Sequence, residues 1–176
     1  MSHHQGKLDG LCGPYAIVNA FEHCGVKDAP DIFEKACNGV AIRRWPKILW
    51  KGTTFNDLKK MIKKCLLKCP EAKKVRVTYP FDKEAPKNNK EYWKEFDQMF
   101  LEHPDARCMI LGLTSPSLHW IVAFKENGTR INFIDSGDPY KPIIRKNRSK
   151  LYAGDRNNNS TTWIITRKEL ILFEVK

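Results

Sequence analysis

Four side chains of the types used in nucleophilic catalysis are spread along the chain: Gln5, Cys12, His119 and Asp135. A cysteine becomes an effective nucleophile when an imidazole takes up its proton and a third group orients that imidazole. An amide side chain such as that of glutamine can stabilise the negative oxygen that forms when a carbonyl is attacked. These residue types indicate covalent catalysis by a thiol, provided that the fold brings the four together.

Cys12 lies between a turn at Asp9-Gly10 and an apolar run that ends at Phe21. The spacing of this run predicts a mostly buried helix, and Pro14 suits its first turn because the N–H that proline lacks has no partner there. A cysteine at a helix N-terminus experiences the positive end of the helix dipole, which favours the thiolate. The same residues also fit a small structural cysteine, because free cysteines are usually buried and inert.

His119 begins a strand-like segment directly after a turn, so we expect its ring to face a cleft while Trp120 faces the other way. Asn127-Gly128 predicts a tight hairpin between this strand and the next. Antiparallel pairing about that turn brings His119 and Asp135 to the same end of the sheet. We therefore expect the Asp135 carboxylate to accept an imidazole N–H and to stabilise the imidazolium. Taken alone, His119 also fits a half-buried structural histidine.

Two further polar residues are candidates for the same site. Gln5 lies seven residues before Cys12 across a glycine-containing loop, so its amide can point to the same oxyanion as the Cys12 N–H. Asp138 competes with Asp135 as the orienting carboxylate, although its SGDP sequence is typical of a turn.

The predicted elements are helical first and strand-rich later. Helical spacing is found at residues 14–21, 32–40, 54–69 and 89–103, and strand-like patterns at 74–79, 107–114, 118–124, 129–135, 161–166 and 169–175. Residues 42–54 and 138–160 are expected to be irregular connections, with Trp45 and Trp50 either lining a groove or covering the core. This order predicts an α+β fold, with N-terminal helices packed on a mostly antiparallel sheet. The length suits a single domain spanning residues 1–176.

The charge of the chain is uneven, with 31 basic and 20 acidic residues and a formal net charge of +11. Such a surface favours anionic partners, including acidic proteins, cell-wall polymers, anionic lipid and nucleic acid, although net charge also serves solubility. The helix expected at 54–69 carries lysines on the face opposite its apolar stripe, which is either a binding face or a solvated one. We favour a protein or peptide substrate over nucleic acid.

The six cysteines form neither a disulfide framework nor paired CxxC motifs. We therefore expect free thiols in a reducing compartment, with no metal and no other cofactor. The first residues do not resemble a signal peptide, and no apolar run approaches the ~18 residues of a membrane span. We expect a monomer that is cytoplasmic, or that is delivered into another cell without a cleaved signal peptide.

The motifs Q-x6-C-G-P near the start, H-W-I-V-A-F at residues 119–124 and I-D-S-G-D-P at 134–139 resemble the papain-like cysteine peptidase superfamily. The step of sixteen residues from His119 to Asp135 is most similar to the bacteriocin-processing branch, which acts on double-glycine leaders. The resemblance implies a papain-like fold. It also implies Cys12 as nucleophile, His119 as general base, Asp135 as its orienting group and Gln5 as oxyanion donor.

Three classes of function remain open at this point. The first is a cysteine hydrolase, a protease or amidase that cleaves a peptide, isopeptide or related amide bond through a thioester. The second is an acyltransferase or transglutaminase-like enzyme with the same triad, because only the species that attacks the thioester differs. The third is a basic binding module without activity, which has no use for Gln5, Cys12, His119 and Asp135 in that order. We favour the hydrolase.

Overall fold

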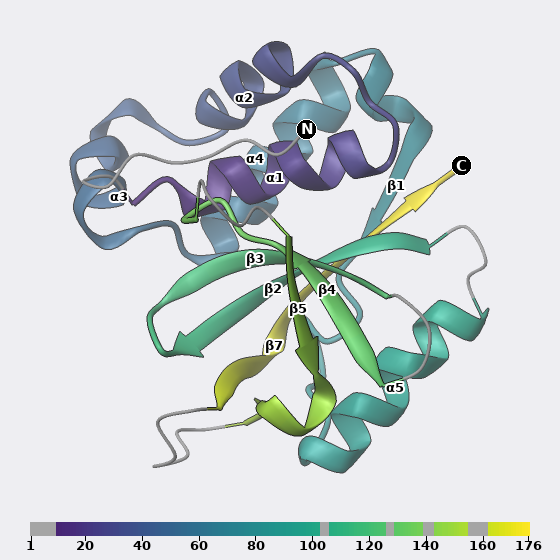
Figure 1. Ribbon diagram of the computed structural model, residues 1–176. Coiled ribbons are helices and arrows are strands. Elements are labelled where there is room, and N and C mark those ends of the chain that lie inside the picture. The colour runs from purple at the N-terminus through teal and green to yellow at the C-terminus, as the bar shows by residue number, and fades with distance from the viewer. Residues whose placement is uncertain (1–9, 103–105, 126–128, 139–142, 155–161) are drawn as a thin grey trace.

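The computed structural model describes residues 10–102, 106–125, 129–138, 143–154 and 162–176 of the chain. In this part of the chain, four helices form a layer on one face of a single sheet, and a fifth helix covers the opposite face (Figure 1). The α-helices are α1 (Cys12–His23), α2 (Ala29–Cys37), α3 (Trp45–Lys51), α4 (Phe55–Lys68) and α5 (Asn89–Glu102). Short 3₁₀ turns are η1 (Ile42–Arg44), η2 (Glu71–Lys74) and η3 (Arg148–Lys150).

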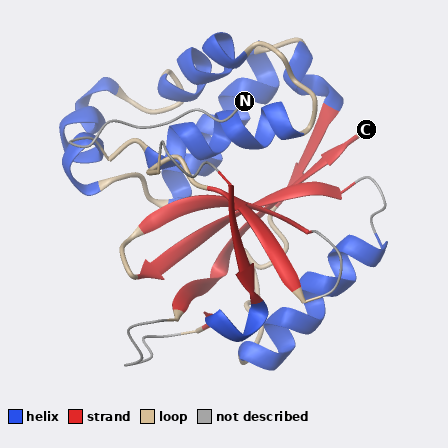
Figure 2. Cartoon of the chain, viewed as in Figure 1, coloured by secondary structure: helices blue, strands red, loops and turns tan. Residues whose placement is uncertain are grey.

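The sheet has seven strands within the described residues, and nearly all of its pairs are antiparallel (Figure 2). The strands are β1 (Val75–Thr78), β2 (Ala106–Ser115), β3 (His119–Lys125), β4 (Arg130–Ile134), β5 (Ile143–Asn147), β6 (Leu151–Ala153) and β7 (Trp163–Val175). Their order is β1-β7-β2-β3-β4-β5, and β6 adds to β7 in parallel. The α+β class predicted from the order of elements is confirmed.

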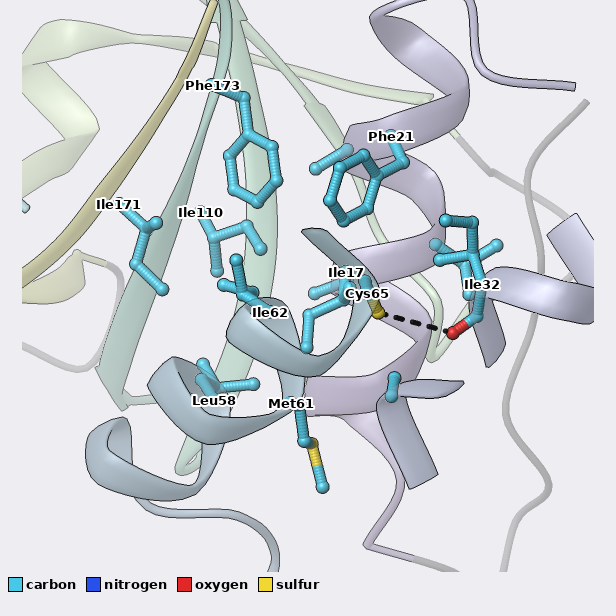
Figure 3. Close-up of a cluster of buried hydrophobic side chains, with 14 of the residues drawn as sticks. Ile17, Phe21, Ile32, Leu58, Met61, Ile62, Cys65, Ile110, Ile171 and Phe173 are labelled. Atoms are coloured by element: carbon cyan, nitrogen blue, oxygen red, sulfur yellow. Dashed lines mark hydrogen bonds between the residues drawn. The ribbon is translucent and has the colours of Figure 1, made fainter. Parts of the chain in front are cut away.

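The core between the sheet and the first helices is built from the apolar stripes of α1, α2 and α4. Figure 3 shows Ile17 and Phe21 of α1 facing Ile110 and Phe173 of the sheet. The rings of Phe21 and Phe173 meet edge to face, with centroids 5.3 Å apart. Cys65 lies in the same core and donates its S–H to the Ile32 carbonyl at 3.5 Å. This core fixes α1 against the strands that carry the candidate site.

A second core lies on the other face of the sheet, under α5. Tyr92 and Phe96 of α5 are fully buried there against Leu111 and Phe133 of the strands. The sheet is therefore buried on both faces, which accounts for the continuous apolar runs at residues 108–111 of β2 and 170–173 of β7.

Three expectations about the elements are wrong. Residues 42–54 contain η1 and α3 rather than an irregular connection, and Pro46 lies in the first turn of α3, where proline is tolerated. The segment 138–160 contains β5, η3 and β6; β5 alternates between exposed and half-buried residues, so no apolar pattern marks it. The runs at 161–166 and 169–175 belong to one strand, β7, which is interrupted by a bulge.

Other local predictions are confirmed. Thr54 caps α4 through a capping box with Asp57, each side chain bonding the backbone N–H of the other. β3 and β4 pair antiparallel as expected, with Val122 opposite Ile134. The Asn127-Gly128 turn itself lies outside the described residues. None of the helices in the described ranges is long and apolar enough to cross a membrane.

Candidate active site

Cys12 is the first residue of α1, and its side chain is 6 % exposed. The preceding residue, Leu11, makes no side-chain capping bond to the helix. The first turn of any helix leaves backbone N–H groups without intrahelical partners. In α1 these N–H groups lie beside the thiol with no capping side chain from Leu11, so they are suited to an oxyanion or another negative group.

Gly13 follows the cysteine because a neighbouring loop approaches the helix there. A Cβ at Gly13 would collide with Oγ1 of Thr53 and come within 2.9 Å of Cδ2 of Leu58. Thr53 belongs to the connection between α3 and α4, and its carbonyl accepts a 3.0 Å hydrogen bond from the indole N–H of Trp120. The start of α1, this connection and β3 are therefore packed together, which places the thiol beside the first residues of β3.

His119 and Asp135 are brought together by the pairing of β3 with β4. His119 is the first residue of β3, and Asp135 directly follows the last residue of β4. Nε2 of His119 lies 2.8 Å from Oδ1 of Asp135, and the two side chains are 13 % and 16 % exposed. The backbone N–H of Gly137 donates to the same Oδ1 at 2.7 Å, which holds the carboxylate in place. The carboxylate bonded to the imidazole is thus that of Asp135, the favoured candidate over Asp138.

The thiol of Cys12 is the other group that lies close to the His119 ring, and both residues line one cavity. Because Asp135 occupies Nε2, the nitrogen left for Cys12 is Nδ1. Burial disfavours the charged ring and on its own would lower the His119 pKa, but the hydrogen bonds to Asp135 and Cys12 outweigh it and raise the pKa to about 9. The imidazole is therefore positively charged at neutral pH, and it bridges the sulfur and the carboxylate.

No protein-family model and no curated protein matches this sequence. Among solved structures, the chain is similar to the peptidase domain of Streptococcus ComA, described as a bi-functional ABC transporter involved in a quorum sensing pathway. The TM-score is 0.53 at 13 % identity, and the match covers 99 % of this chain and 97 % of that one. The chain has the fold of that peptidase domain. The match agrees with the papain-like resemblance of the sequence at the level of the fold, and the chemistry has to be argued from this chain's own side chains.

Within this ComA-like peptidase fold, Cys12 and His119 line one cavity of about 250 Å³. One wall comes from η1 and α3, with Arg44, Lys47 and Lys51. Arg44 forms a 2.6 Å ion pair with the buried Asp57, so its charge is balanced within the wall. The two lysines are exposed cations at the mouth of the cavity.

The opposite wall of the cavity comes from the sheet, through Gly112, Trp120 and Glu169. The expectation that Trp120 faces away from the cleft is wrong, because Trp120 lines the cavity. It shares the helix side of β3 with Val122, and its indole donates to the Thr53 carbonyl there. Glu169 was not foreseen as a site residue. Arg167 and Lys168 precede it, so the sequence predicts a polar turn between two strands at this point.

The remaining candidates lie elsewhere or outside the described ranges. Gln5 is outside them, so its position relative to Cys12 stays a prediction. Trp45 is half-buried against the core and Trp50 is 82 % exposed, and neither is among the residues that line the cavity. No three histidine, cysteine or acidic side chains of the described residues gather closely enough to hold a metal ion.

Proposed function

We propose that the protein is a cysteine peptidase or amidase that hydrolyses a peptide or related amide bond through a thioester on Cys12. The observation that supports this most directly is the set of contacts at His119. Its ring meets the Asp135 carboxylate at 2.8 Å on one side and the Cys12 thiol on the other, beside a cavity that a substrate can enter. No comparable arrangement is needed by a module that only binds.

In the first step the Cys12 thiolate attacks the carbonyl carbon of the scissile bond, and the carbonyl oxygen becomes negative. The N–H groups at the start of α1 stabilise that oxygen, with the Gln5 amide proposed as a second donor. The C–N bond then breaks as the His119 imidazolium gives its proton to the departing amine. The product of this half-reaction is a thioester on Cys12 and a neutral imidazole.

In the second step the neutral imidazole of His119 acts as a general base. It takes a proton from a water molecule, whose oxygen attacks the thioester carbonyl. The C–S bond breaks, the acid product leaves, and the thiolate–imidazolium pair is restored. Asp135 stabilises the imidazolium and, with the N–H of Gly137 bonded to the same oxygen, fixes the orientation of the ring throughout.

The similarity to the ComA peptidase domain supports a peptide as substrate, because the two chains match over nearly their full lengths. The net charge of +11 supports a substrate that is acidic or attached to an anionic polymer. The bacteriocin-processing branch that the motifs resemble usually has an aspartate directly before the cysteine, whereas this chain has Leu11, so we propose the peptidase chemistry and not a particular leader peptide.

The test is a hydrolysis assay on a panel of peptide, isopeptide and cell-wall-derived amides, followed by mapping of an active-site probe. We expect Cys12→Ala to abolish turnover and labelling, because Cys12 is the thiol that lies beside His119 in the cavity. The matched control is Cys37→Ala, which removes a half-buried thiol of α2 that lies outside the cavity. Hydrolysis at an undiminished rate by folded Cys12→Ala protein would refute the proposal.

A further inference from the structure

Glu169 lies in the wall of the cavity that Cys12 and His119 share, although the mechanism above makes no use of it. It is the only carboxylate among the described residues that line this cavity. Its side chain is half-buried, so part of its hydration has been removed. A carboxylate in such a position beside a candidate nucleophile calls for a functional explanation.

The fold places Glu169 there by a bulge in β7. Leu111 of β2 pairs with Leu170, but Leu113 pairs with Ile165, so the single residue Gly112 stands opposite residues 166–169. Bulges of this kind redirect side chains next to active sites. Here the bulge turns Glu169 over β2 and toward the cavity.

Gly112 provides the space that the carboxylate occupies. A Cβ at this position would collide with Oε2 of Glu169 and would lie 3.1 Å from the ring of Trp120. The carboxylate therefore rests on the backbone of β2, close to the indole, on the strand next to the one that begins with His119. The bulge in β7 and the missing side chain of Gly112 together make room for the Glu169 carboxylate in the cavity wall.

Among the described residues no cation forms an ion pair with Glu169, and the nearby Thr166 lowers its pKa too little to offset the effect of burial. Burial raises its pKa above the ordinary value, because the site gives the charge too little compensation. A cation that enters the cavity would supply that compensation and would favour the ionised carboxylate. The unbalanced charge of Glu169 thus distinguishes it from Arg44, whose partner Asp57 is already present.

We propose that Glu169 binds the positively charged side chain of a lysine or arginine next to the scissile bond, so that the substrate is a peptide basic at that position. This inference rests on the proposed function and names the kind of residue that the same site selects. The overall charge of +11 would repel such a side chain at long range. Glu169 reverses that preference locally, while Lys47 and Lys51 across the cavity suit an acidic or carbonyl group elsewhere on the same peptide.

The test uses three methanethiosulfonates that transfer a small group to a thiolate and release methanesulfinate: the cationic 2-aminoethyl, the neutral ethyl and the anionic 2-sulfonatoethyl reagents. Their rates at Cys12 are measured by peptide mapping and are divided by the rates with free 2-mercaptoethanol. The proteins compared are wild type, Glu169→Gln and the control Glu84→Gln. The control removes one acidic charge at an exposed position that is not part of the cavity lining.

We expect the wild-type protein to favour the cationic over the anionic reagent after normalisation, and Glu169→Gln to lower its cationic-to-neutral ratio by about threefold to tenfold. Glu84→Gln should keep the wild-type ratio. High salt should reduce the wild-type preference, because the cavity is open to solvent ions. If Glu169→Gln does not fold, the wild-type protein still tests the inference, because a preference for the cationic reagent that high salt reduces supports it and the absence of that preference contradicts it.

A wild-type preference for the anionic reagent would overturn this inference, as would an unchanged ratio in folded Glu169→Gln protein. In either case rapid modification of Cys12 by the neutral reagent would leave the proposed function standing. If Cys12 of the wild type reacts no faster than Cys37 with the neutral reagent, the proposed function fails and the inference fails with it.

Discussion

The start of α1 and the interface of α2 with α4 each bury a cysteine, and the two thiols have opposite chemical surroundings. Cys12 is 6 % exposed and Cys65 is fully buried, so burial alone hardly distinguishes them. Cys12 contacts a positively charged imidazole at a helix N-terminus. Cys65 bonds the carbonyl of Ile32, and burial, followed by the interactions with Cys69 and Asp31, raises its pKa far above the ordinary value.

The difference shows what turns a buried thiol into a candidate nucleophile. Burial raises the pKa of Cys65, whereas Cys12 lies beside the His119 imidazole, and a neighbouring cation is what favours the nucleophilic form of a cysteine in general. Cys69 makes the same point, because burial and a hydrogen bond with Asp31 raise its pKa to about 12. The contrast can be tested by changing the His119 imidazole beside Cys12, the Asp135 carboxylate that supports it, or the buried thiol of Cys65.

The largest effect is expected from His119→Ala, which removes the cation from the neighbourhood of Cys12. Hydrolysis should fall by about 10²- to 10⁴-fold, the usual contribution of a general acid–base group. Alkylation of Cys12 by iodoacetamide at mildly acidic pH should slow to the rate of an ordinary thiol. The readout is the labelling rate of each cysteine by mass spectrometry. Equal labelling of Cys12 in the variant and in wild type would contradict the contrast between the two cysteines.

A smaller effect is expected from Asp135→Asn, which keeps the shape of the site and removes the charge that stabilises the imidazolium. In wild type, hydrolysis should decline as pH rises through about 9, because His119 then loses the proton that the leaving amine requires. Without the carboxylate the His119 pKa should fall toward its ordinary value, so the decline begins at lower pH. At pH 8 this amounts to about a tenfold loss.

The pH–rate profile of Asp135→Asn is best compared with that of Asp138→Asn. Asp138 also follows β4, but it is not the carboxylate bonded to the His119 ring through Oδ1. An alkaline limit that moves in Asp138→Asn and stays fixed in Asp135→Asn would reverse the assignment.

The smallest effect on chemistry is expected from Cys65→Ala. It should leave the labelling rate of Cys12 unchanged, because Cys65 takes no part in the cavity. Loss of the buried sulfur from the core of α2 and α4 should lower the free energy of unfolding by about 1 kcal/mol. Urea denaturation measures this change, and a variant with altered Cys12 reactivity at wild-type stability would show that the two regions are coupled.

Much of the site could be predicted because its determinants are local. Pro14 and the apolar spacing after it indicate where α1 begins, and so place Cys12 at its first turn. Antiparallel pairing about the hairpin predicted at Asn127-Gly128 brings His119 and Asp135 to one end of the sheet, and the two side chains lie 2.8 Å apart there. Both inferences need only the geometry of one helix or one hairpin.

The positions of Glu169, β5 and Trp120 depend on contacts between residues that lie far apart in the sequence or leave no hydrophobic pattern in it. The position of Glu169 in the cavity wall depends on the register between β2 and β7, whose paired residues lie far apart in the sequence. β5 is an edge strand with one face half-buried and the other exposed, so hydrophobicity gives no sign of it. Trp120 shares the helix side of β3 with Val122, and its indole meets the Thr53 carbonyl, which lies far away in the sequence.

The position of β7 in the middle of the sheet has a consequence for the newborn protein. A ribosome makes residues 163–175 after every other strand described here, yet β7 is the neighbour of both β1 and β2. Phe173 of this strand also packs against Phe21 of the helix that carries the thiol. The packing that holds the start of α1 against the sheet is therefore complete only once β7 has been made and has joined its two neighbours.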